Sequence, residues 1–206
     1  MSVEILRELA KNGQRVFGMD AIEHTALSLG LSKNYLLRLV SNMTQNGELV
    51  SIYKGTYSLP NDFLSGGPLH SFEIALQLAQ KGSISHRSAL AYYQLTDQIL
   101  SKIYVTVPKE NGANLSSKNN YAINGTIYNL IRIDPKNYWG TCYIFIGEAR
   151  VSITDLERTL IDGLTRPDLC GGLREVIFAF EQAIEKMNPS KLFDYAQKTS
   201  IVSCKR

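Results

Sequence analysis

The sequence predicts an α+β protein built from a small N-terminal module and a larger C-terminal domain. Residues 20–59 have the pattern of two helices joined by a tight turn and followed by a β-hairpin, whereas in the rest of the chain most strands precede most helices. The stretch 61–68 (NDFLSGGP) has the glycine and proline content of a linker. We therefore expect one domain over residues 1–62 and a second over 68–206.

Two helices are expected before the tight turn. Apolar residues recur at helical spacing over residues 2–11, and Asn12-Gly13 ends this run. Asp20 is a suitable N-cap for a second helix that extends to about Leu29. The apolar positions of this second helix are expected to face the core: Ile22, Ala26, Leu27 and Leu29.

A third helix is expected over residues 33–45, after Gly30 and an N-cap at Ser32. Its apolar residues form one stripe. Its polar residues Asn34, Arg38, Ser41 and Gln45 lie on the opposite side, and Lys33 and Asn42 flank that side. The next residues, 49–59, give two short β-branched and aromatic strands joined at Lys54-Gly55. This order of elements is typical of a winged helix-turn-helix.

In such a module the second helix of the pair enters a DNA groove, and its N-terminal half reaches base edges. The sequence therefore predicts a DNA-binding site made of Lys33, Asn34, Arg38 and Asn42 on the helix and Lys54 on the hairpin. The alternative is that these residues are only the solvated face of an amphipathic helix. Charge does not decide between them, because residues 1–62 hold six basic and six acidic side chains.

The composition fits a globular protein outside membranes. The chain has 206 residues, a formal net charge of +3 and no apolar run long enough to span a bilayer. The first twelve residues carry two glutamates, which argues against a signal peptide. Three widely spaced cysteines (Cys142, Cys170 and Cys204) fit free thiols in a reducing compartment. We therefore expect a cytoplasmic protein.

The C-terminal domain shows a mixed pattern and no enzyme signature. Phosphate-loop, dinucleotide, zinc-protease and serine-hydrolase motifs are absent from the sequence, and its three histidines have no metal-ligand spacing. Ser85-His86 are adjacent, and adjacent residues seldom face each other, so a capping role for Ser85 or Ser88 at a helix start is the favoured interpretation. We expect neither catalysis, nor a metal, nor a cofactor. The expected helices cover about 72–81, 87–93, 154–164, 173–186 and 189–198, the expected strands cover 102–108, 121–133, 141–146 and 149–153, and 110–120 is expected to be a loop.

The most polar cluster of this domain is Asp155, Glu157, Arg158 and Asp162. Arg158 and Asp162 are four residues apart, so on a helix capped by Thr154 they share one face and can pair. Glu157 and Asp162 are too far apart around the helix for a catalytic carboxylate pair. We favour a structural ion pair that ties this helix to the sheet. A catalytic pair would instead line an open cleft.

Four stretches together resemble the AbiEi antitoxins, transcriptional regulators of bacterial abortive-infection (type IV) toxin–antitoxin operons. They are YKGTYSLP (53–60), SISHRSALAYYQLTDQ (83–98), KIYVTVP (102–108) and VSITDLERTLIDGLTRPDLCGG (151–172). In the last stretch, Glu157, Arg158, Thr159 and Asp162 carry the C-terminal signature of the family. The resemblance covers most of residues 15–195.

The resemblance implies an N-terminal winged-helix DNA-binding domain and a C-terminal domain that counters a nucleotidyltransferase-like toxin, generally without a stable complex. It also implies repression of the protein's own operon at inverted repeats in double-stranded promoter DNA. By position, the DNA role falls on the five residues named above. Repeated half-sites require a dimer or cooperative assembly on DNA. The rival function is a protein-interaction module, in which the C-terminal domain binds the toxin directly.

Overall fold

The chain is described here from a computed structural model that covers residues 2–64, 67–109 and 119–199. It divides into two compact units: Met1–Leu78 with Phe145–Arg150, and Ala79–Ile144 with Val151–Arg206. The described residues form eight α-helices and two β-sheets, which confirms the α+β class. Most of the expected loop 110–120 lies outside the described residues. None of the helices described is long and apolar enough to cross a membrane.

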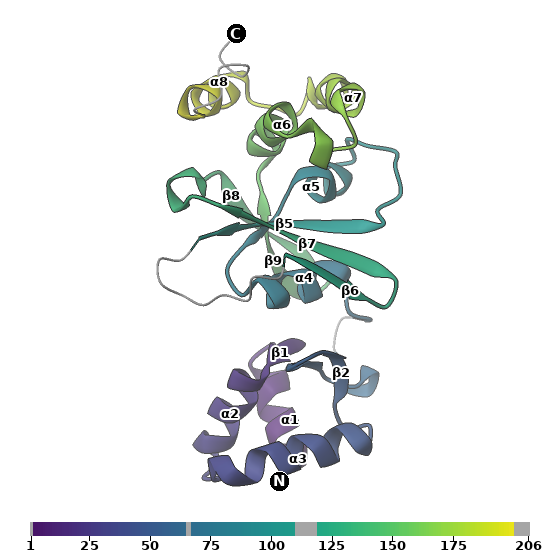
Figure 1. The fold of residues 1–206 in the computed structure, drawn as a ribbon, viewed down its shortest axis with the longest axis vertical. Coiled ribbons are helices and arrows are strands. Elements are labelled where there is room, and N and C mark those ends of the chain that lie inside the picture. Colours follow the sequence, from purple (N-terminus) through teal and green to yellow (C-terminus); the bar gives the residue numbers. More distant parts are fainter. Residues whose placement is uncertain (1, 65–66, 110–118, 200–206) are drawn as a thin grey trace. The chain divides into compact units, whose positions relative to one another are not determined.

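The first unit combines four helices with a three-stranded antiparallel sheet of order β1-β3-β2 (Figure 1). The hairpin β2–β3 and the helices α1 and α3 lie where the sequence predicts them. Strand β1 was not predicted, because three residues are too few to show an alternating pattern. The elements are α1 (Ser2–Lys11), β1 (Val16–Gly18), α2 (Met19–Ser28), α3 (Lys33–Gln45), β2 (Val50–Tyr53), β3 (Thr56–Ser58), the 3-10 turn η1 (Asn61–Phe63) and α4 (Ser71–Ala79).

Two expectations for α2 are wrong. Gly18 occupies the N-cap position, so Asp20 lies inside the first turn instead of capping the helix. Leu27 and Leu29 are 52% and 42% exposed. The buried positions of α2 are Ile22, Thr25 and Ala26, and Leu27 lies about 100° further round the helix, away from the core. Leu29 follows the last helical residue, so helical spacing does not govern its direction.

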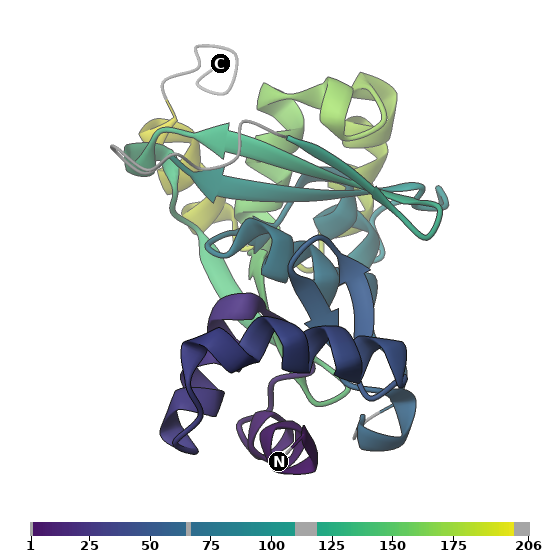
Figure 2. The same ribbon diagram turned by 60° about the horizontal axis from the view of Figure 1, so that its bottom comes forward.

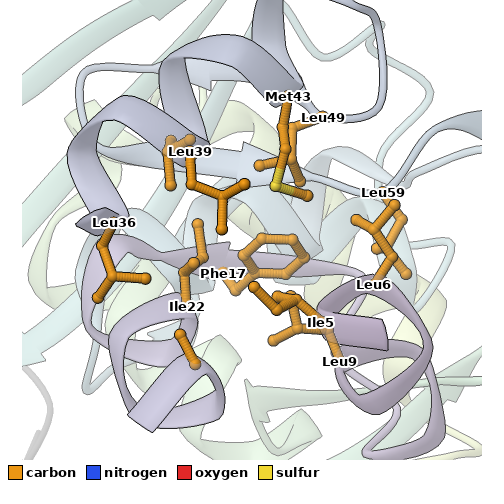
Figure 3. Packing of buried hydrophobic residues seen from close by; sticks show 12 residues of the cluster. Ile5, Leu6, Leu9, Phe17, Ile22, Leu36, Leu39, Met43, Leu49 and Leu59 are labelled. Atoms are coloured by element: carbon orange, nitrogen blue, oxygen red, sulfur yellow. The ribbon is translucent and has the colours of Figure 1, made fainter. Parts of the chain in front are cut away.

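The core of the first unit is formed by α1, β1, α2 and α3, together with Leu49 and Leu59 at the two ends of the hairpin (Figure 3). Phe17 of β1 is 1% exposed, and its ring lies among side chains from the surrounding helices. The largest contribution comes from α3, with four side chains on one stripe. The cluster comprises Ile5, Leu6, Leu9, Phe17, Ile22, Ala26, Leu36, Leu39, Val40, Met43, Leu49 and Leu59. Burial of this stripe fixes which side of α3 faces outward.

The second sheet has six strands in the order β6-β7-β5-β4-β9-β8, and Figures 1 and 2 show its twist. Strand β5 runs parallel to β7, and β4 runs parallel to β9. Strand β4 has only two residues and was not predicted. The strands are β4 (Ser83–Ile84), β5 (Lys102–Pro108), β6 (Asn120–Ile123), β7 (Thr126–Ile133), β8 (Thr141–Ile146) and β9 (Ala149–Thr154), with the 3-10 turn η2 (Pro135–Asn137) before β8.

Four helices complete the second unit and pack around α6. Helix α5 contacts β5, and α6 contacts α5, α7 and α8. Figure 1 shows α6 between α7 and α8. Their contacts form a second apolar cluster around Leu90, Leu160 and Val176. The helices are α5 (His86–Tyr92), α6 (Leu156–Thr165), α7 (Leu173–Ala183) and α8 (Pro189–Lys198), with the 3-10 turn η3 (Pro167–Leu169) between α6 and α7.

Replacement of Phe17 tests the core of the first unit. We expect Phe17→Ala to lower the free energy of unfolding by about 3–5 kcal/mol, because it removes a buried ring and leaves a cavity. The matched control is Leu27→Ala, which truncates an exposed side chain and should change stability by less than about 0.5 kcal/mol. Denaturant unfolding followed by circular dichroism gives both values. Equal losses in the two variants would contradict the assigned core.

Candidate nucleic-acid interface

Helix α3 has one buried side and one exposed side. Arg38 and Asn42 are both exposed and lie four residues apart, so they project from the same side of the helix. The side chain of Asn34, another predicted contact residue, lies outside the described part of the structure. The opposite side holds the buried stripe Leu36, Leu39, Val40 and Met43. Two of the predicted contact residues therefore share one accessible surface.

Lys33 projects in a different direction. Its Nζ lies 2.7 Å from Oε1 of Glu23, so the side chain pairs with α2. Lys33 is also about 140° around the helix from Arg38, counting five residues at 100° each. The Lys33 side chain is largely exposed and that of Glu23 partly so, which makes the contribution of the pair to stability small. Lys33 thus connects the first turn of α3 to α2, and its charge is partly offset by Glu23.

Lys54 lies at the turn of the hairpin β2–β3 and is exposed. The turn is short because Gly55 takes a left-handed backbone conformation with φ of +71°. The carbonyl of Gly55 accepts a hydrogen bond from the backbone N–H of Met19 at 3.1 Å. This hydrogen bond therefore fixes the hairpin tip to the start of α2, which also positions the backbone of Lys54.

Some of the basic side chains in the first 62 residues are already neutralised by ion pairs. Lys11 pairs with Glu8 at 2.6 Å, and Arg15 is buried beside Glu73 at 3.5 Å. Arg15 also donates a hydrogen bond to the carbonyl of Gly67. Within the described residues no ion pair involves Arg38 or Lys54. These two cations are thus the predicted contacts best able to meet an external anion.

The polar cluster of the second unit lies at the start of α6. Asp155, not Thr154, caps this helix, because its side chain accepts a hydrogen bond from the backbone N–H of Arg158 at 2.9 Å. Nε of Arg158 donates to Oδ1 of Asp162 at 2.8 Å, and both side chains are buried. Nη1 of Arg158 donates to the carbonyl of Asn137 at 3.0 Å. The pair therefore ties α6 to the turn before β8 instead of to a sheet strand.

Two further contacts extend this cluster. The Arg158 guanidinium lies 3.9 Å from the centre of the Trp139 ring, a cation–π contact. Oε1 of Glu157 accepts from the backbone N–H of Asn188 at 2.8 Å, and Oε2 lies 2.8 Å from Nζ of Lys191. Burial by itself would raise the pKa of Glu157, but these two partners outweigh it and hold the pKa below its ordinary value. Glu157 thus holds the N-terminus of α8 against α6.

A cavity of about 180 Å³ adjoins the ion pair. Its lining includes Arg158, Asp162 and His86, together with apolar side chains of β7 and α6. The prediction that Ser85 and His86 do not face each other is wrong, because Ser85 Oγ lies 2.9 Å from His86 Nδ1. His86 makes this contact from a left-handed backbone conformation with φ of +51°. Residue spacing gives no signal for that conformation, so the sequence analysis missed this pair.

His86 is shielded from water, and this affects its protonation. Burial lowers the pKa of His86 from its ordinary value, and the carboxylate of Asp162 offsets this only in part. Thr106 Oγ1 donates a hydrogen bond to Ser85 Oγ at 2.8 Å, and Ser85 Oγ in turn lies within hydrogen-bond distance of His86 Nδ1. Because burial disfavours the charged form, the imidazole is mainly neutral at pH 7.

The fold has a counterpart among solved structures. A crystal structure of the protein Rv2827c from Mycobacterium tuberculosis is similar with a TM-score of 0.64, over 98% of this chain and 73% of that chain. The sequence identity is 14%, so the likeness shows the fold alone. The sequence matches no protein-family model and no curated protein.

The buried histidine predicts a pH dependence of stability. Because the folded-state pKa of His86 is lowered, the unfolded chain binds a proton more readily, so this residue's contribution to stability is lost as pH falls below about 6.5. His86→Asn removes the titrating group, and asparagine tolerates the left-handed backbone. Unfolding free energies at pH 7 and pH 5 should therefore differ less in the variant than in the wild type. Identical pH slopes would contradict the neutral, buried imidazole.

Proposed function

We propose that the protein is a DNA-binding transcriptional regulator whose first unit is a winged helix-turn-helix. In this proposal α2 and α3 form the helix-turn-helix, α3 is the recognition helix, and β2–β3 is the wing. The observation that carries the proposal is the exposed side of α3, where Arg38 and Asn42 project together. Lys54 supports it as an exposed cation at the hairpin tip.

The chemistry of these side chains suits the two kinds of DNA contact. Arginine donates two hydrogen bonds to guanine in the major groove, and asparagine pairs in a similar way with adenine. Lys54 suits a phosphate contact, which positions a protein without reading sequence. Lys33 is a weaker candidate than Arg38, because Glu23 already offsets its charge.

The resemblance to the AbiEi antitoxins extends this proposal. The protein would occupy inverted repeats in the promoter of its own operon in the cytoplasm, and it would counter a nucleotidyltransferase-like toxin without a catalytic step of its own. The buried contacts of Glu157, Arg158 and Asp162 support a structural role for the C-terminal signature, because these side chains are engaged within the unit.

The balanced charge of residues 1–62 favours one rival, in which the first unit is a protein-docking fold and the C-terminal unit binds the toxin directly. The two functions differ in their response to salt. Phosphate contacts release counterions, so DNA binding must weaken as salt rises. Binding to DNA that does not change with salt, or stable co-purification with the toxin, would favour the docking module.

The first prediction from this function concerns Arg38. If Arg38 reads a base, Arg38→Ala should weaken binding to the promoter fragment upstream of the gene by about 1–3 kcal/mol, and binding to scrambled DNA much less. Fluorescence anisotropy with both DNAs measures the difference. The matched control is Lys11→Ala, which removes a cation of the same module that is already paired with Glu8. Wild-type affinity in the Arg38 variant would remove α3 from the interface.

The second prediction concerns Lys54. Lys54→Ala should weaken binding evenly across DNA sequences and reduce the slope of log K against log salt by about one, because one phosphate contact is lost. The measurement is a titration of promoter and scrambled DNA at four salt concentrations. A loss confined to the promoter fragment would assign Lys54 to base recognition, and an unchanged slope would place the hairpin tip away from the duplex.

A further inference from the structure

Helix α7 exposes large apolar side chains along one line. Leu173 is 57% exposed, Ile177 is 52% exposed and Ile184 is 65% exposed. Ile184 follows the last residue of α7 and keeps helical backbone angles, so the line continues to it. Scattered exposed apolar residues are ordinary on protein surfaces. Three large apolar side chains exposed along one line of a helix instead form a continuous apolar surface.

The spacing of these residues is that of a coiled-coil seam. Leu173, Ile177, Phe180 and Ile184 follow one another at intervals of four, three and four residues. This is the alternation of the two apolar positions in a heptad repeat. Phe180 is half-buried against the apolar cluster of its own unit, so it anchors the middle of the seam. The seam extends over about 16.5 Å, because Leu173 and Ile184 are eleven steps of about 1.5 Å apart along the helix axis.

The charges beside the seam determine which orientation of a partner helix fits. Arg174 and Glu181 are exposed and occupy equivalent flanking positions, each directly after a seam residue. The corresponding positions on the other flank, Val176 and Ala183, are buried in the unit itself. In an antiparallel pair of identical helices, Arg174 of one helix lies beside Glu181 of the other, and two-fold symmetry repeats the contact. A parallel pair would place each charge beside the apolar flank.

We propose that α7 binds α7 of a second copy of this chain in an antiparallel pair, with Leu173 against Ile184 and Ile177 against Phe180 of the partner. This inference goes beyond the proposed DNA binding and does not depend on it. The occupant is a second copy because the flank is complementary to itself: each helix offers one positive and one negative group at matching positions.

The size of the seam predicts a weak dimer. Stable interfaces bury about 800 Å² on each partner, and a seam of four side chains is smaller than that. The association is therefore expected at protein concentrations on the order of 0.1–1 mM. Two protomers held on neighbouring DNA half-sites would have a high effective concentration, which would populate the same contact.

Charge reversal tests the pairing on the full chain without DNA. In sedimentation equilibrium, the apparent mass of the wild type should rise toward that of a dimer as concentration increases to about 1 mM. Arg174→Glu alone should weaken the association about tenfold or more, because two like-charge contacts form by symmetry. The double variant Arg174→Glu with Glu181→Arg should restore the wild-type association. If Arg174 and Glu181 acted only within one chain, the double variant would not restore the association.

Two controls complete the experiment. Lys136→Glu reverses an exposed cation of the same unit outside the seam and should leave the association unchanged. Ile177→Asp places a charge in the seam and should abolish association, and circular dichroism should show an unchanged fold because the side chain is exposed. A wild type that stays monomeric up to 1 mM, or a double variant that stays as weak as Arg174→Glu, would overturn the proposal. If the dimer forms but DNA does not bind, only the regulator function fails.

Discussion

The burial of one stripe of α3 is the constraint on which the arrangement of the first unit depends. Four side chains of this helix belong to the same buried cluster as Phe17, and their burial fixes the rotation of α3 about its axis. Once that rotation is set, Arg38 and Asn42 must face outward, because they lie on the other side of the same helix. The core and the candidate interface are therefore two results of one packing arrangement. A change in the core would also redirect the candidate contact residues.

In the second unit, charged residues face inward and are stabilised by many partners. Removing Arg158 and Asp162 from water is costly, and the attraction between them offsets this cost only where further hydrogen bonds are made. Arg158 has such partners in a carbonyl, the Asp162 carboxylate and the Trp139 ring. Asp162 Oδ2 has no hydrogen-bond partner in the part of the chain that the structure describes. The cluster thus fixes α6 to the turn before β8 and leaves a polar group at the adjacent cavity.

The sequence predicted the elements whose signal is local. Strand β5 and helices α1 and α3 have clear apolar periods, and the hairpin is marked by Lys54-Gly55, so their limits follow closely from spacing. The contact of Ser85 with His86 could not be predicted, because it needs a left-handed residue that the surrounding structure imposes. Likewise Leu27 counts as apolar in any pattern, and only the position of α2 against the core shows that it is exposed. Of the candidate site, the shared side of Arg38 and Asn42 was predictable from spacing, whereas the pairing of Lys33 with Glu23 was not.

Because the candidate interface carries so few cations, a regulator of this kind would bind DNA weakly as a single protomer. Arg38 and Lys54 are two positive groups, and so small a number of phosphate and base contacts gives weak binding at physiological salt. A single protomer would then discriminate poorly between a specific site and the rest of the genome. Two protomers on neighbouring half-sites multiply their affinities if even a weak contact connects them. A short apolar seam on α7 is of the right strength for this purpose, since a tighter one would hold the dimer together away from DNA and remove the dependence on two adjacent sites.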